Sequence, residues 1–405
     1  MLSIFAKPAL PAPAVTYGAR DPRLDFFRGL ALIFIFVDHV PANPFAHITF
    51  RNFGFSDAAE MFVFISGYAA AMAFGRTYMR EGFAAGTRRV VLRIGQIYVA
   101  HVLLLIACVG GIGIAARIFE SPLYYEYINL VPFAYEPFEA IWRALALNHH
   151  LLYLNILPLY IVLLLWFPAL FWLLRKHPAW AFAASVALYA VTRLTGLNLP
   201  SYPNEDGWFF NPFAWQLLFS IGAILGHAAA RGVALPRSRA LTAAAVLYAL
   251  FALVVIAPWT KIPAFAEWRL VPGDLLAPMN KSSMSLWRLA HILALAYLVA
   301  IMVNPGAAWL RRRWAQGVAA CGRKSLDIFT LGTFLCFVAL FIRVEAGRDL
   351  WILVAINVSG ILLMVAVAKW LLRRKAQVNP GPTPAIAPAA AAGVSLSAQP
   401  RSPRR

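Results

Sequence analysis

Ten long apolar segments constrain this chain more than any other feature of its sequence. Each has roughly 17–25 residues, the length that a helix needs to cross the hydrocarbon core of a bilayer. In lipid the backbone must satisfy its own hydrogen bonds, so we expect every segment to be a helix. The sequence therefore predicts an all-α polytopic membrane protein. The expected spans cover residues 25–41, 57–75, 90–115, 151–174, 179–196, 211–230, 240–257, 286–303, 318–341 and 351–372.

Composition and charge agree with this interpretation. Hydrophobic residues make up 61% of the chain and charged residues 13%, whereas soluble domains are about half apolar and a quarter charged. The net charge of +19 is concentrated in every second connection between the spans. Basic connections face the cytoplasm, so we expect both chain ends inside and an even number of spans. The basic charge therefore needs no nucleic-acid partner.

The chain divides into three parts by composition. We expect residues 1–23 to be a cytoplasmic segment, because their basic residues belong to the set of connections expected on that side. They also lack a signal-peptide pattern. Residues 24–374 form the ten-helix transmembrane domain. Residues 375–405 are rich in Pro and Ala and predict a disordered cytoplasmic tail. Three cysteines give neither a disulfide framework nor a metal-binding spacing.

The first apolar segment carries charged groups at both ends. Arg28 and His39 are eleven residues apart, so they lie within about 20° of one helix face and about 16 Å apart along the axis. Asp25 lies one turn before Arg28 and can pair with it, while Asp38 points to another side of the helix. Polar groups inside a span usually mark a pathway or a site. The alternative is that Asp25 and Arg28 are interfacial and His39 snorkels at the outer mouth.

A second group of polar residues begins the next segment. Asp57 and Glu60 are one turn apart near the outer end, at the level expected for His39. Glu60 could orient the His39 ring and raise its basicity, or both carboxylates could be solvated at the interface. Ser66 can bond across a helix interface, and Gly67 permits close approach of a neighbour, which could be the first span.

Two arginines lie on one face at the start of the third segment. Arg89 and Arg93 are four residues apart, near the expected cytoplasmic end. Guanidinium groups one turn apart can bind phosphates in a bidentate manner. The alternative is a charge cluster that only sets the topology, and this already accounts for Arg88.

The connections expected on the outer side are long and rich in Trp and Tyr. They cover residues 117–149, 197–210 and 258–285. Such residues form interfacial belts, but their faces also stack on the apolar faces of sugars. The sequence leaves both interpretations open.

An ordered set of motifs in this chain resembles the integral-membrane acyltransferase 3 superfamily, and more closely its OpgC branch. The set begins with Arg28 and His39 at their spacing of eleven, within LDFFRGLAL and DHVP, and continues with FISGY. The further stretches are RNFGFSDAAEMF, YLNILPLYIVLL, NPFAWQLLFSIG and GRKSLDIFTLGT. The resemblance covers roughly residues 20–372. The chain departs from the pattern at Asn155, where an acidic residue is expected, and at Lys324, where a histidine is expected.

The resemblance implies a ten-helix membrane acyltransferase of the bacterial inner membrane. Its donor, succinyl-CoA or acetyl-CoA, is reached from the cytoplasm, and its acceptor is a periplasmic glucan or another envelope polysaccharide. It implies no metal and no tightly bound cofactor. His39 would be the general base, Arg28 would hold the donor or fix Asp25, and Arg89 and Arg93 would bind the phosphates of coenzyme A.

A succinyl donor carries a second carboxylate that needs a cation of its own. Arg288, with His291 three residues on, is one candidate. The alternative is that Arg288 snorkels to the outer interface. Two other classes of function stay open, a transporter or flippase without bond chemistry and a scaffold for envelope-glycan proteins. The lack of a clear internal repeat disfavours the transporter, and the scaffold leaves His39 without a role.

Overall fold

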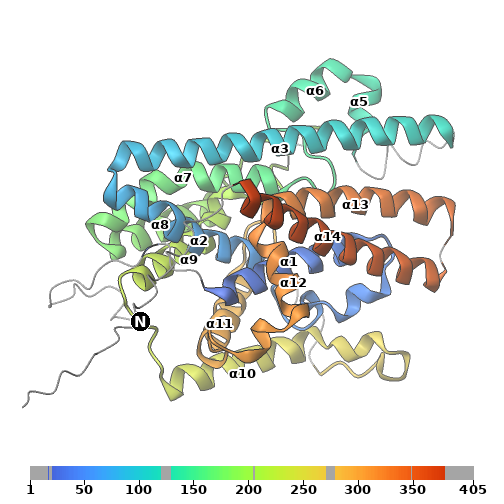
Figure 1. Ribbon diagram of the computed structural model, residues 1–405. Coiled ribbons are helices and arrows are strands. Elements are labelled where there is room, and N and C mark those ends of the chain that lie inside the picture. Colours follow the sequence, from blue (N-terminus) through green and yellow to red (C-terminus); the bar gives the residue numbers. More distant parts are fainter. Residues whose placement is uncertain are drawn as a thin grey trace, which may run out of the picture.

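The computed structural model describes residues 17, 21–119, 129–203, 206–270, 279–347 and 349–378, and contains no β-strand within them. Ten long helices lie at the ten expected spans, although the ninth span is divided between two helices (Figure 1). The prediction of an all-α polytopic membrane protein is confirmed. The long helices are α1 (Pro22–His39), α2 (Ala58–Arg80), α3 (Phe83–Ile118), α7 (Ile156–Lys176), α8 (Pro178–Thr195), α9 (Pro212–Ala230), α10 (Arg239–Ile256), α11 (Leu286–Met302), α13 (Ser325–Glu345) and α14 (Leu350–Val378).

Seven helices are long and apolar enough to cross a membrane by themselves: α2, α3, α7, α9, α10, α13 and α14. The helices α1, α8 and α11 fall short of that test. α11 has only 17 residues, and α1 contains the charged groups discussed above. Neighbouring helices must shield the polar groups of these helices from lipid, since exposing a charged side chain to lipid costs free energy.

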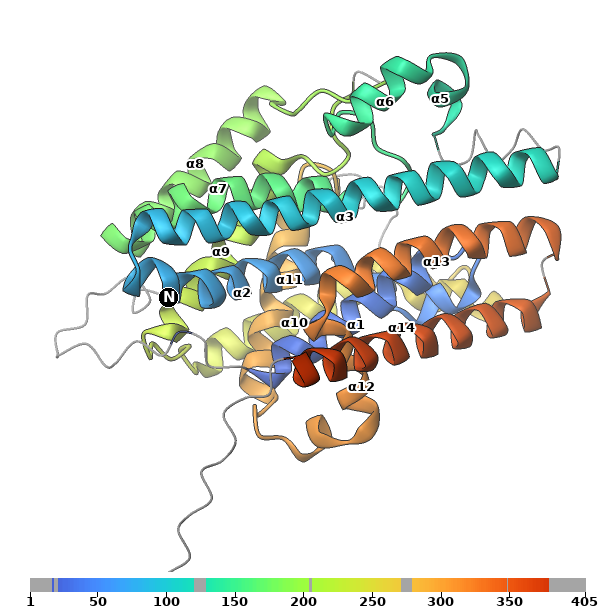
Figure 2. The same ribbon diagram turned by 45° about the horizontal axis from the view of Figure 1, so that its top comes forward.

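Shorter helical elements connect the long ones. They are η2 (Pro44–Ile48), η3 (Phe50–Asn52), α5 (Val131–Tyr135), α6 (Pro137–Leu145), η4 (Pro258–Lys261), η5 (Pro263–Phe265), η7 (Ala308–Arg311) and α12 (Arg313–Arg323). The pair η2–η3 follows α1 directly and leads into α2. The short helices α5 and α6 lie beside the second half of α3 (Figure 2).

The expected ninth span, residues 318–341, is wrong as a single helix. α12 ends at Arg323 and α13 begins at Ser325, with Lys324 outside helical geometry between them. The reason is a close crossing of α12 and α1. A Cβ on Gly29 would lie 1.9 Å from the Val318 oxygen, and one on Gly322 would lie 1.9 Å from the Asp25 oxygen. α12 is therefore held against α1, and the chain turns before continuing as α13.

Glycines also bring α2 and α9 into close contact. A Cβ on Gly67 would lie 2.0 Å from the Phe219 oxygen, and one on Gly222 would lie 2.2 Å from the Phe64 oxygen. Small residues allow this approach, which favours packing in membranes. The helix that packs at Gly67 is therefore α9, and the expectation that it could be the first span is wrong.

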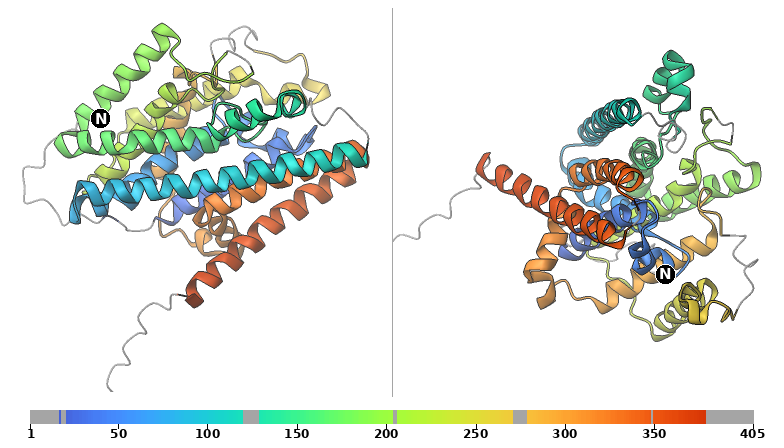
Figure 3. Two further views of the ribbon diagram at one scale, coloured as in Figure 1. Left: turned by 90° about the horizontal axis from the view of Figure 1, so that it is seen from above. Right: turned by 90° about the vertical axis from the view of Figure 1, so that its right-hand side faces the viewer.

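The helices differ in how deeply they are buried. The most apolar stretches of α2 and α9 are 72% and 78% buried, while those of α10 and α14 are 22% and 28% buried. An end-on view places α10 and α14 at the rim of the bundle (Figure 3). The centre of the bundle, where α1, α2 and α9 lie, is thus the region shielded from lipid.

The chain ends depart slightly from the expected boundaries. α1 begins at Pro22, capped by Asp21, and α14 continues to Val378, so residues 375–378 are helical. The rest of the expected tail, and most of the expected N-terminal segment, lie outside the described residues. Tyr17 is described, and its hydroxyl lies 2.7 Å from Nδ1 of His227 in α9.

Candidate active site

His39 is the last residue of α1, next to the loop that leads to α2. Its Nδ1 lies 2.5 Å from the Ile35 carbonyl oxygen. Because a carbonyl only accepts hydrogen bonds, Nδ1 carries the proton and the lone pair of the neutral ring is on Nε2. The ring also meets the edge of Tyr153, with 4.6 Å between the centroids and an interplanar angle of 79°. The ring is therefore held in one orientation and one tautomer, with the lone pair on Nε2.

Arg28 lies on the same helix, about 16 Å away along its axis. Its Nη2 donates to the Ile65 carbonyl of α2 at 3.1 Å. Asp25 is buried at the crossing of α1 and α12, and Ser66 is buried in α2. Arg28 thus ties α1 to the middle of α2, and the pairing of Arg28 with Asp25 stays a prediction.

Four charged residues form an ion network between α2 and α11, which we call the outer ion cluster: Asp57, Glu60, Lys281 and Arg288. Arg288 Nε donates to Glu60 Oε1 at 2.6 Å, and its Nη2 donates to Asp57 Oδ2 at 3.1 Å. Lys281 Nζ donates to the same Asp57 oxygen at 2.5 Å. The Glu60 side chain is completely buried. The two carboxylates that the sequence places one turn apart therefore share one guanidinium.

The local sequence explains why the outer ion cluster forms. Asp57 caps α2 by accepting from the Ala59 N–H at 2.8 Å, and Glu60 accepts from the Asp57 N–H at 2.9 Å. This reciprocal arrangement is a capping box. It turns both carboxylates toward α11. The contacts of the Glu60 carboxylate are with Arg288 and Asp57, so the structure describes a partner other than His39 for each of its oxygens.

Arg288 and His291 have defined roles in this region. The Arg288 side chain is 12% exposed and turns toward the two carboxylates, so it does not snorkel to the interface. Nδ1 of His291 lies 2.6 Å from Ser56 Oγ, and a Cβ on Gly54 would lie 2.2 Å from the His291 ring. Both residues therefore bind the segment that precedes α2.

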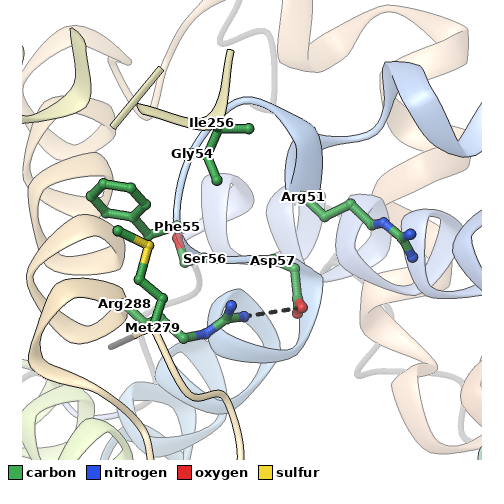
Figure 4. A pocket seen from close by; sticks show the side chains of 8 residues that line it. All are labelled: Arg51, Gly54, Phe55, Ser56, Asp57, Ile256, Met279 and Arg288. Atoms are coloured by element: carbon green, nitrogen blue, oxygen red, sulfur yellow. Dashed lines mark hydrogen bonds and ion pairs between the residues drawn. The ribbon is translucent and has the colours of Figure 1, made fainter. Parts of the chain in front are cut away.

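A pocket opens beside the outer ion cluster (Figure 4). The Asp57 carboxylate faces Arg288, while the Arg51 guanidinium points to another side. Arg51 lies 3.9 Å from Asp38, and Thr49 donates to the same Asp38 oxygen at 2.6 Å. The pocket is lined by Arg51, Gly54, Phe55, Ser56, Asp57, Ile256, Met279 and Arg288. Asp38, which Arg51 of the pocket lining approaches, is the chain neighbour of His39, and this links the pocket to His39.

Arg89 and Arg93 lie at the opposite end of the bundle from the outer ion cluster, near the start of α3. Arg89 Nη1 donates to Thr77 Oγ1 of α2 at 2.8 Å, and Arg93 Nη1 donates to Gln96 Oε1 at 3.0 Å. Arg89 is exposed and Arg93 is half-buried. Both guanidinium groups remain at the surface where an anion can reach them.

A group of polar residues precedes α7, and of these only Asn155 was noted from the sequence, as a departure from the family pattern. We call residues 148–155 the polar segment. It contains Tyr153, which touches His39, and it faces His101 of α3. A signal was present, because two adjacent histidines and two asparagines at the mouth of an apolar span are unusual. The structure brings this segment to His39 through the ring of Tyr153.

The structure describes only part of the aromatic connections that the sequence predicts on the outer side. Between η4 and residue 270, four apolar side chains line a second pocket: Trp259, Phe265, Trp268 and Leu270. Trp268 is 65% exposed. The structure thus gathers aromatic side chains here into one surface hollow, which fits either a lipid interface or a sugar.

The fold and this arrangement define a polytopic membrane protein with a histidine and charged groups in its interior. A comparison with protein families matches residues 20–376 to the family described as OpgC protein, so the chain belongs to the OpgC family. Membership supports a role in glucan modification and an enzyme of the acyltransferase type. Neither a search of curated proteins nor one of solved structures finds a match.

Proposed function

We propose that this protein is a membrane O-acyltransferase that moves an acyl group from acyl-CoA to a hydroxyl of a periplasmic glucan or a similar envelope polysaccharide. The observation that carries the proposal is the hydrogen bond from His39 Nδ1 to the Ile35 carbonyl. It leaves the Nε2 lone pair to act as general base. Family membership supports the reaction class.

The reaction follows from this tautomer. His39 Nε2 takes the proton of the acceptor hydroxyl while the hydroxyl oxygen bonds to the thioester carbonyl carbon. The carbon–sulfur bond then breaks, and the coenzyme A thiolate leaves and receives the proton from His39. Transfer is direct in this scheme, so no acyl-enzyme is needed.

The donor would approach from the end of the bundle at which α3 begins. Arg89 and Arg93 are accessible there, and coenzyme A carries phosphates that guanidinium groups bind well. Arg28 lies between this end and His39, on the expected path of the acyl chain. The basic residues around this end support a cytoplasmic face and both termini inside, in the bacterial inner membrane.

A succinyl group is the acyl group that we favour, because the pocket near His39 is rich in cations. Arg288 is already held by Asp57 and Glu60, so we assign the succinyl carboxylate to Arg51. The Arg51 side chain is 48% exposed and lies 3.9 Å from its nearest described carboxylate. Lys261, which contacts Asn52, adds positive charge nearby.

The deciding experiment is mass spectrometry of periplasmic glucans from cells with the wild-type gene, without it, and with His39→Ala. We expect substituents of about 100 Da to be lost in the deletion and in His39→Ala, since a general base contributes about 10²–10⁴-fold to the rate. Western analysis of the membrane fraction checks insertion of the variant. Glucans that keep their substituents in His39→Ala would refute the role of His39, and unaltered glucans in the deletion would refute the acceptor.

A second measurement tests the donor site. Arg93→Ala should weaken the binding of coenzyme A to the purified protein, whereas Arg80→Ala, an exposed arginine near the end of α2, is the matched control. Equal binding by the Arg93 variant, the control and the wild type would remove Arg93 from the donor site.

A further inference from the structure

Several buried polar atoms between α3 and the polar segment have no hydrogen-bond partner among the described residues. They are Nδ1 and Nε2 of His101, Nε2 of His150, and Oδ1 of both Asn148 and Asn155. His101 is only 1% exposed. Buried polar groups are nearly always partnered in proteins, because an unsatisfied one loses its hydrogen bonds to water without replacement. A group of five such atoms in one region is therefore unusual.

Two contacts hold α3 against this part of the chain. Tyr98, three residues before His101, donates its hydroxyl proton to the Leu145 carbonyl at 2.9 Å. Farther along α3, Leu104 packs in one apolar cluster with Leu151 and Leu154 of the polar segment. His101 lies between these two contacts on α3. The polar segment is therefore held against the face of α3 that carries His101.

The same segment reaches the candidate base. Tyr153 has a φ of 71°, in the left-handed region that bulky residues rarely adopt. In this conformation its ring meets the His39 ring with 4.6 Å between the centroids. Elsewhere in the polar segment, the His150 ring packs against the buried Trp208 ring, with 4.6 Å between the ring centroids. Three of the five unpartnered atoms, those of Asn148, His150 and Asn155, thus lie on the segment that touches His39.

The chemistry of these atoms selects the kind of ligand. Burial, followed by His101 and His149, lowers the pKa of His150 to about 3, so the ring is neutral and one of its nitrogens carries a lone pair. The two asparagine oxygens and the free lone pair of His150 are acceptors. A phosphate or carboxylate would meet lone pairs here, whereas each hydroxyl of a sugar can both donate and accept.

We propose that His101 and the polar segment form a subsite for one neutral sugar unit of the acceptor, next to the unit whose hydroxyl His39 deprotonates. His101, His150, Asn148 and Asn155 bind its hydroxyls. This inference rests on the proposed function, since it takes the acceptor to be a glucan. It adds to the site a set of residues that bind the acceptor and do not contact the donor.

The test is direct binding to the purified full-length protein in detergent, measured by calorimetry. The probes are the cell's own periplasmic glucan, freed of substituents by mild base, and coenzyme A. The variants are His101→Leu and Asn155→Leu, and the matched control is His47→Leu, whose histidine is exposed on η2. We expect both variants to bind the glucan at least tenfold more weakly, with coenzyme A affinity and thermal stability equal to those of the control.

The outcomes separate the subsite from the proposed function. Glucan affinity equal to the control in both variants would overturn the subsite, and the polar atoms would then bind ordered water only. A loss of coenzyme A affinity instead would assign the cluster to the donor and also overturn it. A third outcome is that the variants lose glucan binding but the wild-type protein transfers no acyl group. That result would support the subsite and refute the acyltransferase.

Discussion

Two polar regions flank His39, and they differ in whether the protein itself satisfies them. In the outer ion cluster, Asp57 and Glu60 both bind described cations, and Glu60 also caps its own helix. In the polar segment and His101, five buried atoms lack such partners among the described residues. The first region is complete by itself and stabilises the fold. The second has hydrogen-bonding capacity left over, which suits a ligand.

The comparison predicts opposite effects on stability when each region is made less polar. Removing one partner from a complete buried network leaves a charge without its counterpart. Removing an atom that has no partner relieves an existing cost. Four variants, taken from the largest expected effect to the smallest, test whether the two regions differ in this way.

The largest effect is expected for Arg288→Ala. Glu60 is fully buried, and removing the guanidinium leaves its carboxylate without a cation, which costs about 3–5 kcal/mol. Thermal unfolding in detergent measures the loss. The matched control is Arg143→Ala, because Arg143 pairs with Glu139 on the surface, where both side chains are more than 40% exposed, and such a pair is worth about 0–1 kcal/mol. Similar losses in both variants would contradict the importance of burial.

Glu60→Gln should have a smaller effect. The amide keeps the shape of the side chain but weakens a charge-assisted hydrogen bond to Arg288, so we expect a loss of about 1–3 kcal/mol in the free energy of unfolding. Combined with Arg288→Met, the double variant should recover part of the stability lost in Arg288→Met alone, because no buried charge remains without a partner. Additive losses would show that the two side chains do not act as a pair.

Asp57→Ala tests the cap separately from the charge. Loss of an N-cap carboxylate costs about 0.5–2 kcal/mol, and α2 begins at the next residue. Asp57→Asn is the control, because an asparagine side chain can still accept from the Ala59 N–H while losing its charge. A melting temperature that falls equally in both variants would assign the whole effect to Lys281 and Arg288 rather than to the cap.

Asn155→Leu should have the smallest effect and the opposite sign. Its Oδ1 is buried without a described partner, so replacing it should leave the free energy of unfolding unchanged or raise it by up to about 1 kcal/mol. The control is Asn43→Leu, because Asn43 is buried and donates to Val37 and Asn357 at 2.8 and 2.9 Å. Destabilisation of the Asn155 variant to the level of the control would show that the polar segment is structural.

Much of the fold could be predicted because bilayer length and helix periodicity are local properties. The seven helices that are long and apolar enough to cross a membrane follow from apolar length alone. The capping box at Asp57 and Glu60 is also a local motif, and the structure contains it. The expected span at 318–341 is wrong because hydropathy carries no information on helix crossings. α1 and α12 cross at Gly29 and Gly322, and the chain turns at Lys324.

The partners of polar side chains could not be predicted, because they come from distant parts of the chain. The sequence places Glu60 at the level of His39, but its carboxylate binds Arg288, which is 228 residues away. The sequence predicts that Gly67 permits close approach of a neighbouring helix. Only the packing of the bundle decides that this helix is α9. His101 was not predicted to be a site residue, because a single histidine in a long apolar helix can be structural or functional.

The sequence by itself determined that this is a helical membrane protein, where its long helices lie, and that Arg28 and His39 share one helix face. These properties depend on residue spacing and on transfer between water and lipid, which each segment decides for itself. Only the tertiary structure decided which charges are paired, which helix meets each glycine, and that the polar segment lies against His39. Those properties depend on contacts between segments far apart in the chain, and a linear pattern does not contain them.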